Sequence, residues 1–68
     1  MTSIAKTISG KYEFSVYQFS DSEFRLYRRP LNPRTGEPWQ KRQNIQRFIG
    51  ENAKAKAMFA WCKMAKAA

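Results

Sequence analysis

Residues 11–29, KYEFSVYQFSDSEFRLYRR, determine the predicted fold. Aromatic and β-branched residues dominate the first half of this stretch, and Tyr12, Phe14 and Val16 alternate there with polar residues. Alternation with a period of two is typical of a strand that buries one face. Residues 11–19 are therefore predicted to form a half-buried strand.

The second half of the stretch repeats this pattern after a turn. Residues 20–22 are Ser-Asp-Ser, which supply turn-forming side chains. Residues 23–29 then place Phe24 and Leu26 on one face of a second strand. The other face takes Arg25, Tyr27 and Arg29. Because the connection is short, the two strands are expected to form an antiparallel hairpin.

The following residues predict a turn and a third strand. Pro30 and Pro33 have no N–H to donate to a sheet, so they end the second strand. The sequence Asn-Pro-Arg-Thr-Gly at residues 32–36 is a turn pattern. Residues 39–49 are interpreted as a third strand with a bulge or the start of a turn near Arg47, because Phe48 breaks the alternation. A helix that begins at Asn44 is the competing interpretation.

Residues 51–66 are predicted to form a helix, since alanine is frequent and nothing β-branched interrupts it. The helical period places Met58, Trp61 and Cys62 on one side beside Ala65, with Phe59 at the border. Trp61 is predicted to be a core residue, and Cys62 a small buried one. A second possible contact stripe, which would allow close approach of a backbone, consists of Ala53, Ala57, Ala60 and Met64.

These elements predict an α+β fold: a three-stranded antiparallel sheet with one C-terminal helix packed on one face, in the order β-β-β-α. Residues 1–10 are expected to be a flexible basic N-terminal tail, and residues 11–68 a single small domain. The sheet face opposite the helix would be bare. Its predicted residues are Ser15, Tyr17, Arg25, Tyr27, Arg29, Gln40, Arg42, Asn44 and Gln46.

Composition argues against several classes of function. The 68 residues contain 13 Lys or Arg, five Asp or Glu, one Cys and no His, for a net charge of +8. A lone Cys62 allows no internal disulfide and, without His, makes a zinc site improbable. No cofactor, no metal and no enzymatic activity are expected. No apolar run approaches the length of a membrane span, and we expect a cytoplasmic protein, associated with the nucleoid if it binds DNA.

Positive charge is concentrated between Arg25 and Arg47, where seven basic residues accompany one acid, Glu37. Cations neutralise phosphates, and amide side chains read base edges, so the cluster favours nucleic-acid binding over a merely solvated surface. The expected phosphate contacts are Arg28, Arg34, Lys41 and Arg47. The expected base contacts are Arg25, Arg29, Gln40, Arg42, Asn44 and Gln46, with Tyr27 beside them.

Three stretches resemble the arm-type DNA-binding domain of phage tyrosine recombinases, which is related in shape to AP2 domains. They are Phe-Arg-Leu-Tyr-Arg at 24–28, Asn-Pro-Arg-Thr-Gly at 32–36, and residues 51–61. The resemblance implies a sheet laid in the major groove of double-stranded DNA with the helix behind it. It also implies a basic N-terminal tail near the DNA backbone, a role for Lys6 and Lys11. Residues 39–48 depart from the pattern, being longer and more basic, and the recombinase catalytic domain is absent. We therefore expect a detached domain, a fragment, or a small phage or mobile-element protein.

Two other functions compete with DNA binding. A small phage-type protein could bind and inhibit a host protein or nucleoprotein machine through the aromatic anchors Tyr17, Tyr27 and Phe59. An RNA-binding module could instead use Tyr17 and Tyr27 as stacking platforms on the sheet.

Overall fold

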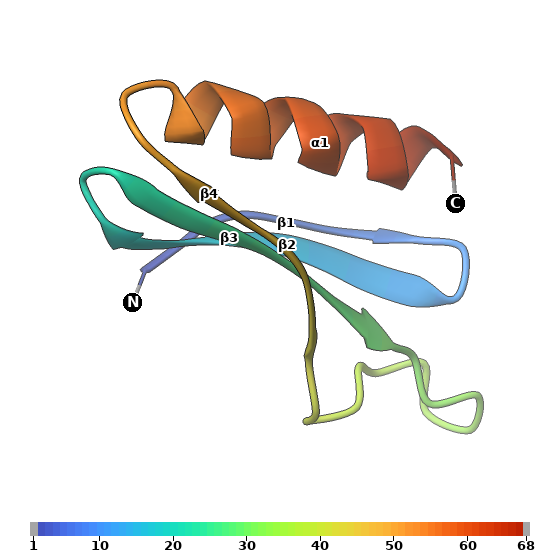
Figure 1. Ribbon diagram of the computed structural model, residues 1–68. Helices are drawn as coiled ribbons and strands as arrows, with labels where there is room; N and C mark the ends of the chain where they lie inside the picture. Colours follow the sequence, from blue (N-terminus) through green and yellow to red (C-terminus); the bar gives the residue numbers. More distant parts are fainter. Residues whose placement is uncertain (1, 68) are drawn as a thin grey trace.

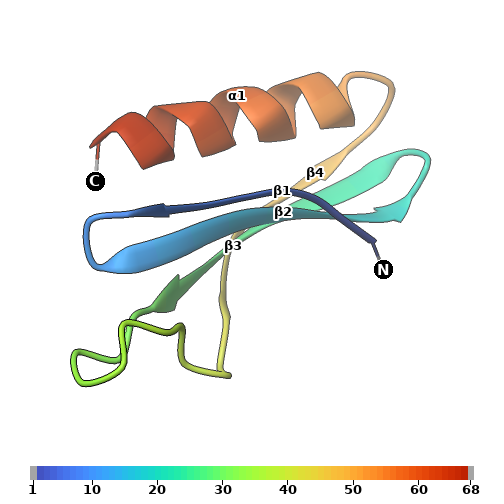
Figure 2. The same ribbon diagram turned by 180° about the vertical axis from the view of Figure 1, so that it is seen from behind.

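The computed structural model describes residues 2–67, which form one antiparallel sheet and one helix. The strands follow one another in space as in sequence, so the sheet is a simple meander, with the helix lying across one face (Figures 1 and 2). The elements are β1 (Thr2–Ser9), β2 (Tyr12–Ser20), β3 (Glu23–Pro30), β4 (Gln43–Ile49) and α1 (Ala53–Ala67). The predicted α+β class, with an antiparallel sheet and one C-terminal helix, is confirmed. The predicted number of strands is wrong, because the sheet has four strands and not three.

The additional strand comes from the segment predicted to be a flexible tail. β1 pairs with β2 along its length, from Thr2 opposite Gln18 to Ser9 opposite Tyr12. A two-residue turn at Gly10 and Lys11 joins them, and Gly10 adopts the positive φ of 62° that such a turn favours. β1 carries few large apolar side chains, so its pattern is weak. Its backbone nevertheless pairs with the free edge of β2, which would otherwise lack ladder partners.

The hydrophobic core lies between α1 and the sheet. Val16, Phe24, Leu26 and Phe48 are buried beneath the helix, against Ala53 and Ala57. The two alanines are at most 1% exposed, and their small side chains let the helix backbone approach the sheet closely. The alanine stripe predicted as the second possibility is thus the one in contact. Within residues 2–67, no helix is long and apolar enough to cross a membrane.

The bulky stripe predicted for the helix divides between two environments. Met58 and Trp61 pack partly buried against the core, and the indole N–H of Trp61 donates to the carbonyl of Phe14 at 3.0 Å. Cys62 is exposed, so the prediction of a buried thiol is wrong. The reason is rotational: with Ala53 and Ala57 centred on the sheet, Cys62 turns outward.

β2 is more deeply buried than predicted. Residues 13–17 are all buried, although Tyr12, Phe14 and Val16 were expected to alternate with exposed neighbours. On the face turned away from α1, Arg29 pairs with Glu13, and Tyr27 and Arg42 contact Tyr17. The sheet therefore has no bare face along β2.

The third predicted strand, residues 39–49, is observed only over β4, residues 43–49. The predicted bulge is present, but it lies at Ile45, two residues before Arg47: Tyr27 lies opposite Asn44, whereas Leu26 lies opposite Gln46. The extra residue reverses the alternation, so Asn44 and Gln46 belong to opposite faces. The competing prediction of a helix from Asn44 is wrong, because this residue is in β4.

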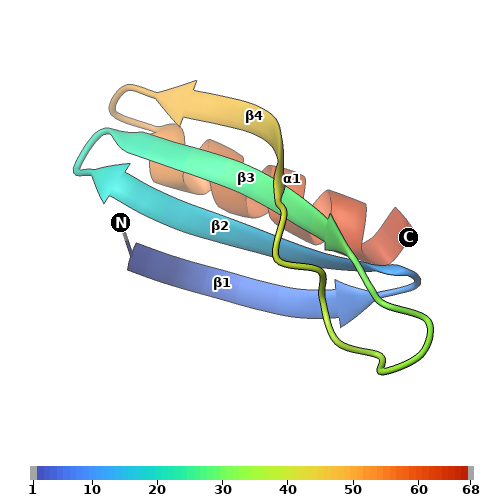
Figure 3. The ribbon, with the colours of Figure 1, turned by 90° about the horizontal axis from the view of Figure 1, so that it is seen from below.

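The connection between β3 and β4, residues 31–42, projects from the sheet on the side opposite α1 and crosses in front of β3 (Figures 1 and 3). A bridge between Leu31 and Pro38 closes its first part. Inside it, the N–H of Gly36 donates to the carbonyl of Asn32 at 2.7 Å, and Gly36 takes a φ of 76°. The predicted turn is thus a small hydrogen-bonded hairpin with Arg34 at its tip.

Candidate nucleic-acid interface

The open face is defined here as the face of the sheet turned away from α1. Its members follow from the strand register and the alternation of side chains. They are Ser3, Lys6, Ile8, Glu13, Ser15, Tyr17, Phe19, Glu23, Arg25, Tyr27, Arg29, Asn44, Arg47 and Ile49. The connection borders this face, since Arg42 at its end lies over Tyr17.

Three aromatic rings run across the open face, and arginines cover both ends of the row. Tyr27 meets Tyr17 edge-on, with ring centroids 5.5 Å apart, and Phe19 at 6.5 Å. The guanidinium of Arg42 lies 4.5 Å from the Tyr17 centroid, and that of Arg25 lies 4.0 Å from the Phe19 centroid. With the Arg42 guanidinium over its ring and Tyr27 at its edge, Tyr17 is only 6% exposed. The row therefore presents guanidinium groups at its ends and not free ring faces.

Glu23 holds two arginines of neighbouring strands. Its Oε2 accepts from Arg25 at 2.7 Å and from Arg47 at 3.0 Å. The hydrogen bond from Arg25, followed by the charge of Arg47, holds the pKa of Glu23 below its ordinary value. A carboxyl with a depressed pKa stabilises the fold above its unfolded-state pKa, and this contribution is lost as pH falls through the folded-state value. Near neutral pH two cations thus share one anion, and a net positive charge remains.

Arg29 is held differently, by a buried ion pair across the hairpin. Its Nη2 lies 2.9 Å from Oε1 of Glu13, and its Nε donates to the same oxygen at 3.1 Å. The side chains are only 17% and 5% exposed, respectively. Arg29 was predicted to reach base edges, but its guanidinium is engaged within the fold. Its role in this structure is to neutralise a buried carboxylate.

Replacing Glu13 by glutamine is expected to destabilise the protein by about 2 kcal/mol, because it leaves Arg29 without its counter-charge. The cost falls below that of a fully buried pair because Arg29 keeps some exposure. Urea unfolding measures the change, with Glu37→Gln in the exposed connection as the matched control. Equal midpoints for the two variants would contradict the assigned role of Glu13.

The connection supplies three exposed cations. Arg34, Lys41 and Arg42 are exposed, and Glu37 is the only acid among residues 31–42. At the tip, the side-chain oxygen of Asn32 accepts from the backbone N–H of Arg34 at 2.9 Å, which fixes the turn that carries the exposed Arg34 guanidinium. Gln40 and Lys41 line a shallow hollow beside Trp39, which is 49% exposed.

Not every predicted site residue reaches the open face. Arg28 lies opposite Phe14 on the helix side, where its Nε donates to Gln43 at 2.8 Å and its guanidinium lies 4.8 Å from the Tyr12 ring. Gln46 belongs to the helix side too, because of the bulge. Lys11 is exposed in the β1–β2 turn. The open face and the connection bring together Lys6, Arg25, Tyr27, Arg29, Arg34, Gln40, Lys41, Arg42, Asn44 and Arg47.

The side of the molecule opposite α1 is consequently basic. This side carries seven cations and three carboxylates. The cations are Lys6, Arg25, Arg29, Arg34, Lys41, Arg42 and Arg47, and the carboxylates are Glu13, Glu23 and Glu37. Sequence reasoning missed Glu13 and Glu23 as anchors of these arginines, although each alternates onto the same face as its partner.

No protein-family model matches the sequence, and neither a curated protein nor a solved structure matches it. Charge, burial and contacts within residues 2–67 are therefore the grounds for a functional assignment.

Proposed function

We propose that this protein binds double-stranded DNA, without catalysis, through its open face and the connection between β3 and β4. The observation that carries the proposal is the excess of seven cations over three carboxylates on the side opposite α1. Phosphate neutralisation supplies most of the affinity of DNA-binding surfaces, and the excess of cations on this side provides the charge for it. The resemblance to arm-type domains implies the same orientation, with the helix behind the sheet.

The β3–β4 edge and the connection would enter the major groove. A two-stranded ribbon fits this groove, and β4 is an edge strand of the sheet. Arg34, Lys41 and Arg47 would meet phosphates, which fix the register of the protein on the duplex. Arg42, Asn44 and Gln40 would reach base edges, because all three are exposed beside Tyr27 or at the end of the connection.

Duplex DNA suits this surface better than single-stranded RNA. Recognition of single strands uses aromatic ring faces on which bases stack. Here Tyr17 is 6% exposed and Arg42 covers its ring, while Arg25 covers that of Phe19. The guanidiniums that occupy these ring faces are themselves groups that contact phosphates and guanine.

Binding to duplex DNA, single-stranded DNA and RNA over a salt series tests the proposal. We expect the duplex to bind most tightly, with log Kd depending steeply on log salt concentration. Weak and equal binding to all three nucleic acids would contradict the proposal and favour a protein partner. A preference for single-stranded nucleic acid would mean that bases stack on the aromatic rings of Tyr17, Tyr27 and Phe19.

Arg42→Ala and Asn44→Ala are each expected to reduce sequence discrimination by about 1–3 kcal/mol, the value of a good bidentate base contact. The measurement compares binding to a duplex selected from a random pool with binding to unselected duplex. Asn52→Ala, in the exposed segment before α1, is the matched control for Asn44. Equal losses on both duplexes would mean that these side chains touch only phosphate.

A further inference from the structure

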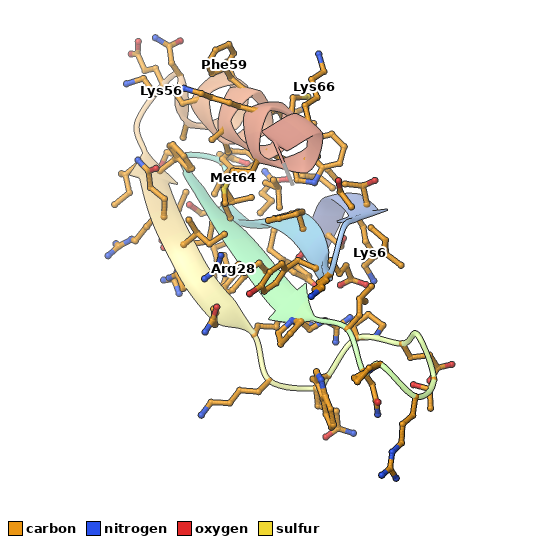
Figure 4. The ribbon with its side chains drawn as sticks, turned by 90° about the vertical axis from the view of Figure 1, so that its right-hand side faces the viewer. Lys6, Arg28, Lys56, Phe59, Met64 and Lys66 are labelled. Atoms are coloured by element: carbon orange, nitrogen blue, oxygen red, sulfur yellow. The ribbon has the colours of Figure 1, made fainter. Side chains whose placement is uncertain are left out.

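The outward side of α1 carries an exposed aromatic ring among lysines. Phe59 is 72% exposed, and it lines a shallow hollow together with Cys62, Lys63 and Lys66. These four residues are called the helix patch. Phe59 and Lys66 point away from the sheet, whereas Met64 points toward it (Figure 4). Residues 53–66 contain four lysines and no acid, so nothing on the helix offsets the positive charge of the patch.

We propose that the helix patch docks an acidic protein segment that inserts an apolar side chain beside Phe59. An exposed aromatic ring next to a hollow is a typical anchor of a protein interface. The lysines would pair with carboxylates of the partner at the rim, where complementary charge steers association. Tyr17 and Tyr27 contact each other on the open face, so Phe59 is the most exposed of the three rings predicted above as anchors.

Charge and shape argue against other occupants. A second copy of this chain would bring Lys63 and Lys66 against like charges, on a protein whose net charge is +8. A membrane-surface helix needs a broad apolar face, whereas Phe59 is the sole bulky apolar side chain of the patch. Phosphate binding gives no reason for an exposed phenyl ring between lysines.

The patch and the open face lie on opposite sides of the molecule, with the sheet and the core between them (Figures 1 and 4). A partner on α1 would therefore leave the connection and the open face free. If the open face binds DNA, the domain would link an acidic protein to DNA. Docking on the patch does not depend on DNA, so it can succeed or fail independently of the proposed function.

The test uses synthetic acidic peptides as probes. The apolar peptide combines Asp and Glu with Leu and Phe. The control peptide has the same charges, with Ser at the apolar positions. We expect the apolar peptide to bind at least about tenfold more tightly, as for one interface anchor. It should also slow alkylation of Cys62, the lone cysteine, which lies in the patch. Equal binding of the two peptides, or unchanged alkylation, would overturn the proposal.

Variants locate the site. Phe59→Ala, and the double change Lys63→Glu with Lys66→Glu, are each expected to weaken the apolar peptide about tenfold or more. Lys54→Glu, on the same helix but outside the patch, should change the affinity much less. Two further probes are tested for protection of Cys62: vesicles that contain anionic lipid, and, separately, single-stranded DNA. Stronger protection of Cys62 by either of them than by the peptide would assign the patch to a membrane or to nucleic acid.

Discussion

Phe24→Ala is expected to unfold the protein. Phe24 is 2% exposed, lies opposite Phe48 in the sheet and forms part of the core beneath α1. Truncating a buried phenylalanine costs about 3–5 kcal/mol. A domain of this size has a total stability near the low end of about 5–15 kcal/mol. Circular dichroism with urea unfolding should show loss of most structure without denaturant, or a midpoint far below that of the parent.

Phe59→Ala is the matched control for this prediction, because it makes the same chemical change on the other side of the helix. Phe59 is 72% exposed, and its truncation should alter stability by less than about 0.5 kcal/mol. Similar unfolding midpoints for the two variants would mean that α1 does not cover the sheet through the face described here.

The hairpin was predictable from sequence because its apolar residues alternate strongly. Phe24 and Leu26 are buried beneath α1, and Arg25, Tyr27 and Arg29 lie on the other face, as predicted. β1 was not predictable in the same way, since its side chains are mostly small or polar and only one face packs against anything large. Its pairing satisfies backbone groups of β2, which no side-chain pattern records.

A bulge explains the misplacement of Gln46 at the site. The bulge at Ile45 sends Asn44 and Gln46 to different faces, although both were predicted on the bare face. A shift by one residue reverses every later side chain, and the sequence contains no Gly that would mark Ile45. The irregularity between Gln18 and Ser20 did not disturb the prediction, since Arg25, Tyr27 and Arg29 lie on the predicted face.

The orientation of α1 was only partly predictable. Helical periodicity defined two apolar stripes, and tertiary packing chose the one with smaller residues, Ala53 and Ala57. Alanine allows the helix to approach the sheet closely. The large side chains of Phe24 and Phe48 on the sheet then fill the space between the two layers. Cys62 and Phe59 are exposed as a consequence. Phe59 was named from the sequence as an aromatic anchor, whereas Cys62 was predicted to be buried.

Removing two cations of the connection is expected to have the largest effect on DNA binding. Each phosphate contact contributes about 0.9 to the slope of log affinity against log salt, so Arg34→Ala with Lys41→Ala should lower the slope by about 1.8. If the parent and the double variant have equal affinities near 1 M salt, the variant would bind duplex DNA about 60-fold more weakly than the parent near 0.1 M salt. Both side chains are exposed, so the fold should persist.

Comparison of this variant with one that loses two lysines of α1 tests the central claim most directly. Lys54→Ala with Lys56→Ala removes the same charge from the opposite side of the molecule, outside the helix patch. Fluorescence anisotropy of a labelled duplex gives the affinity and the salt slope of the parent and both variants. The proposed orientation predicts a large loss of affinity and slope for Arg34 with Lys41, and little change for Lys54 with Lys56. Equal losses, or a greater loss for the helix pair, would contradict binding through the open face and the connection.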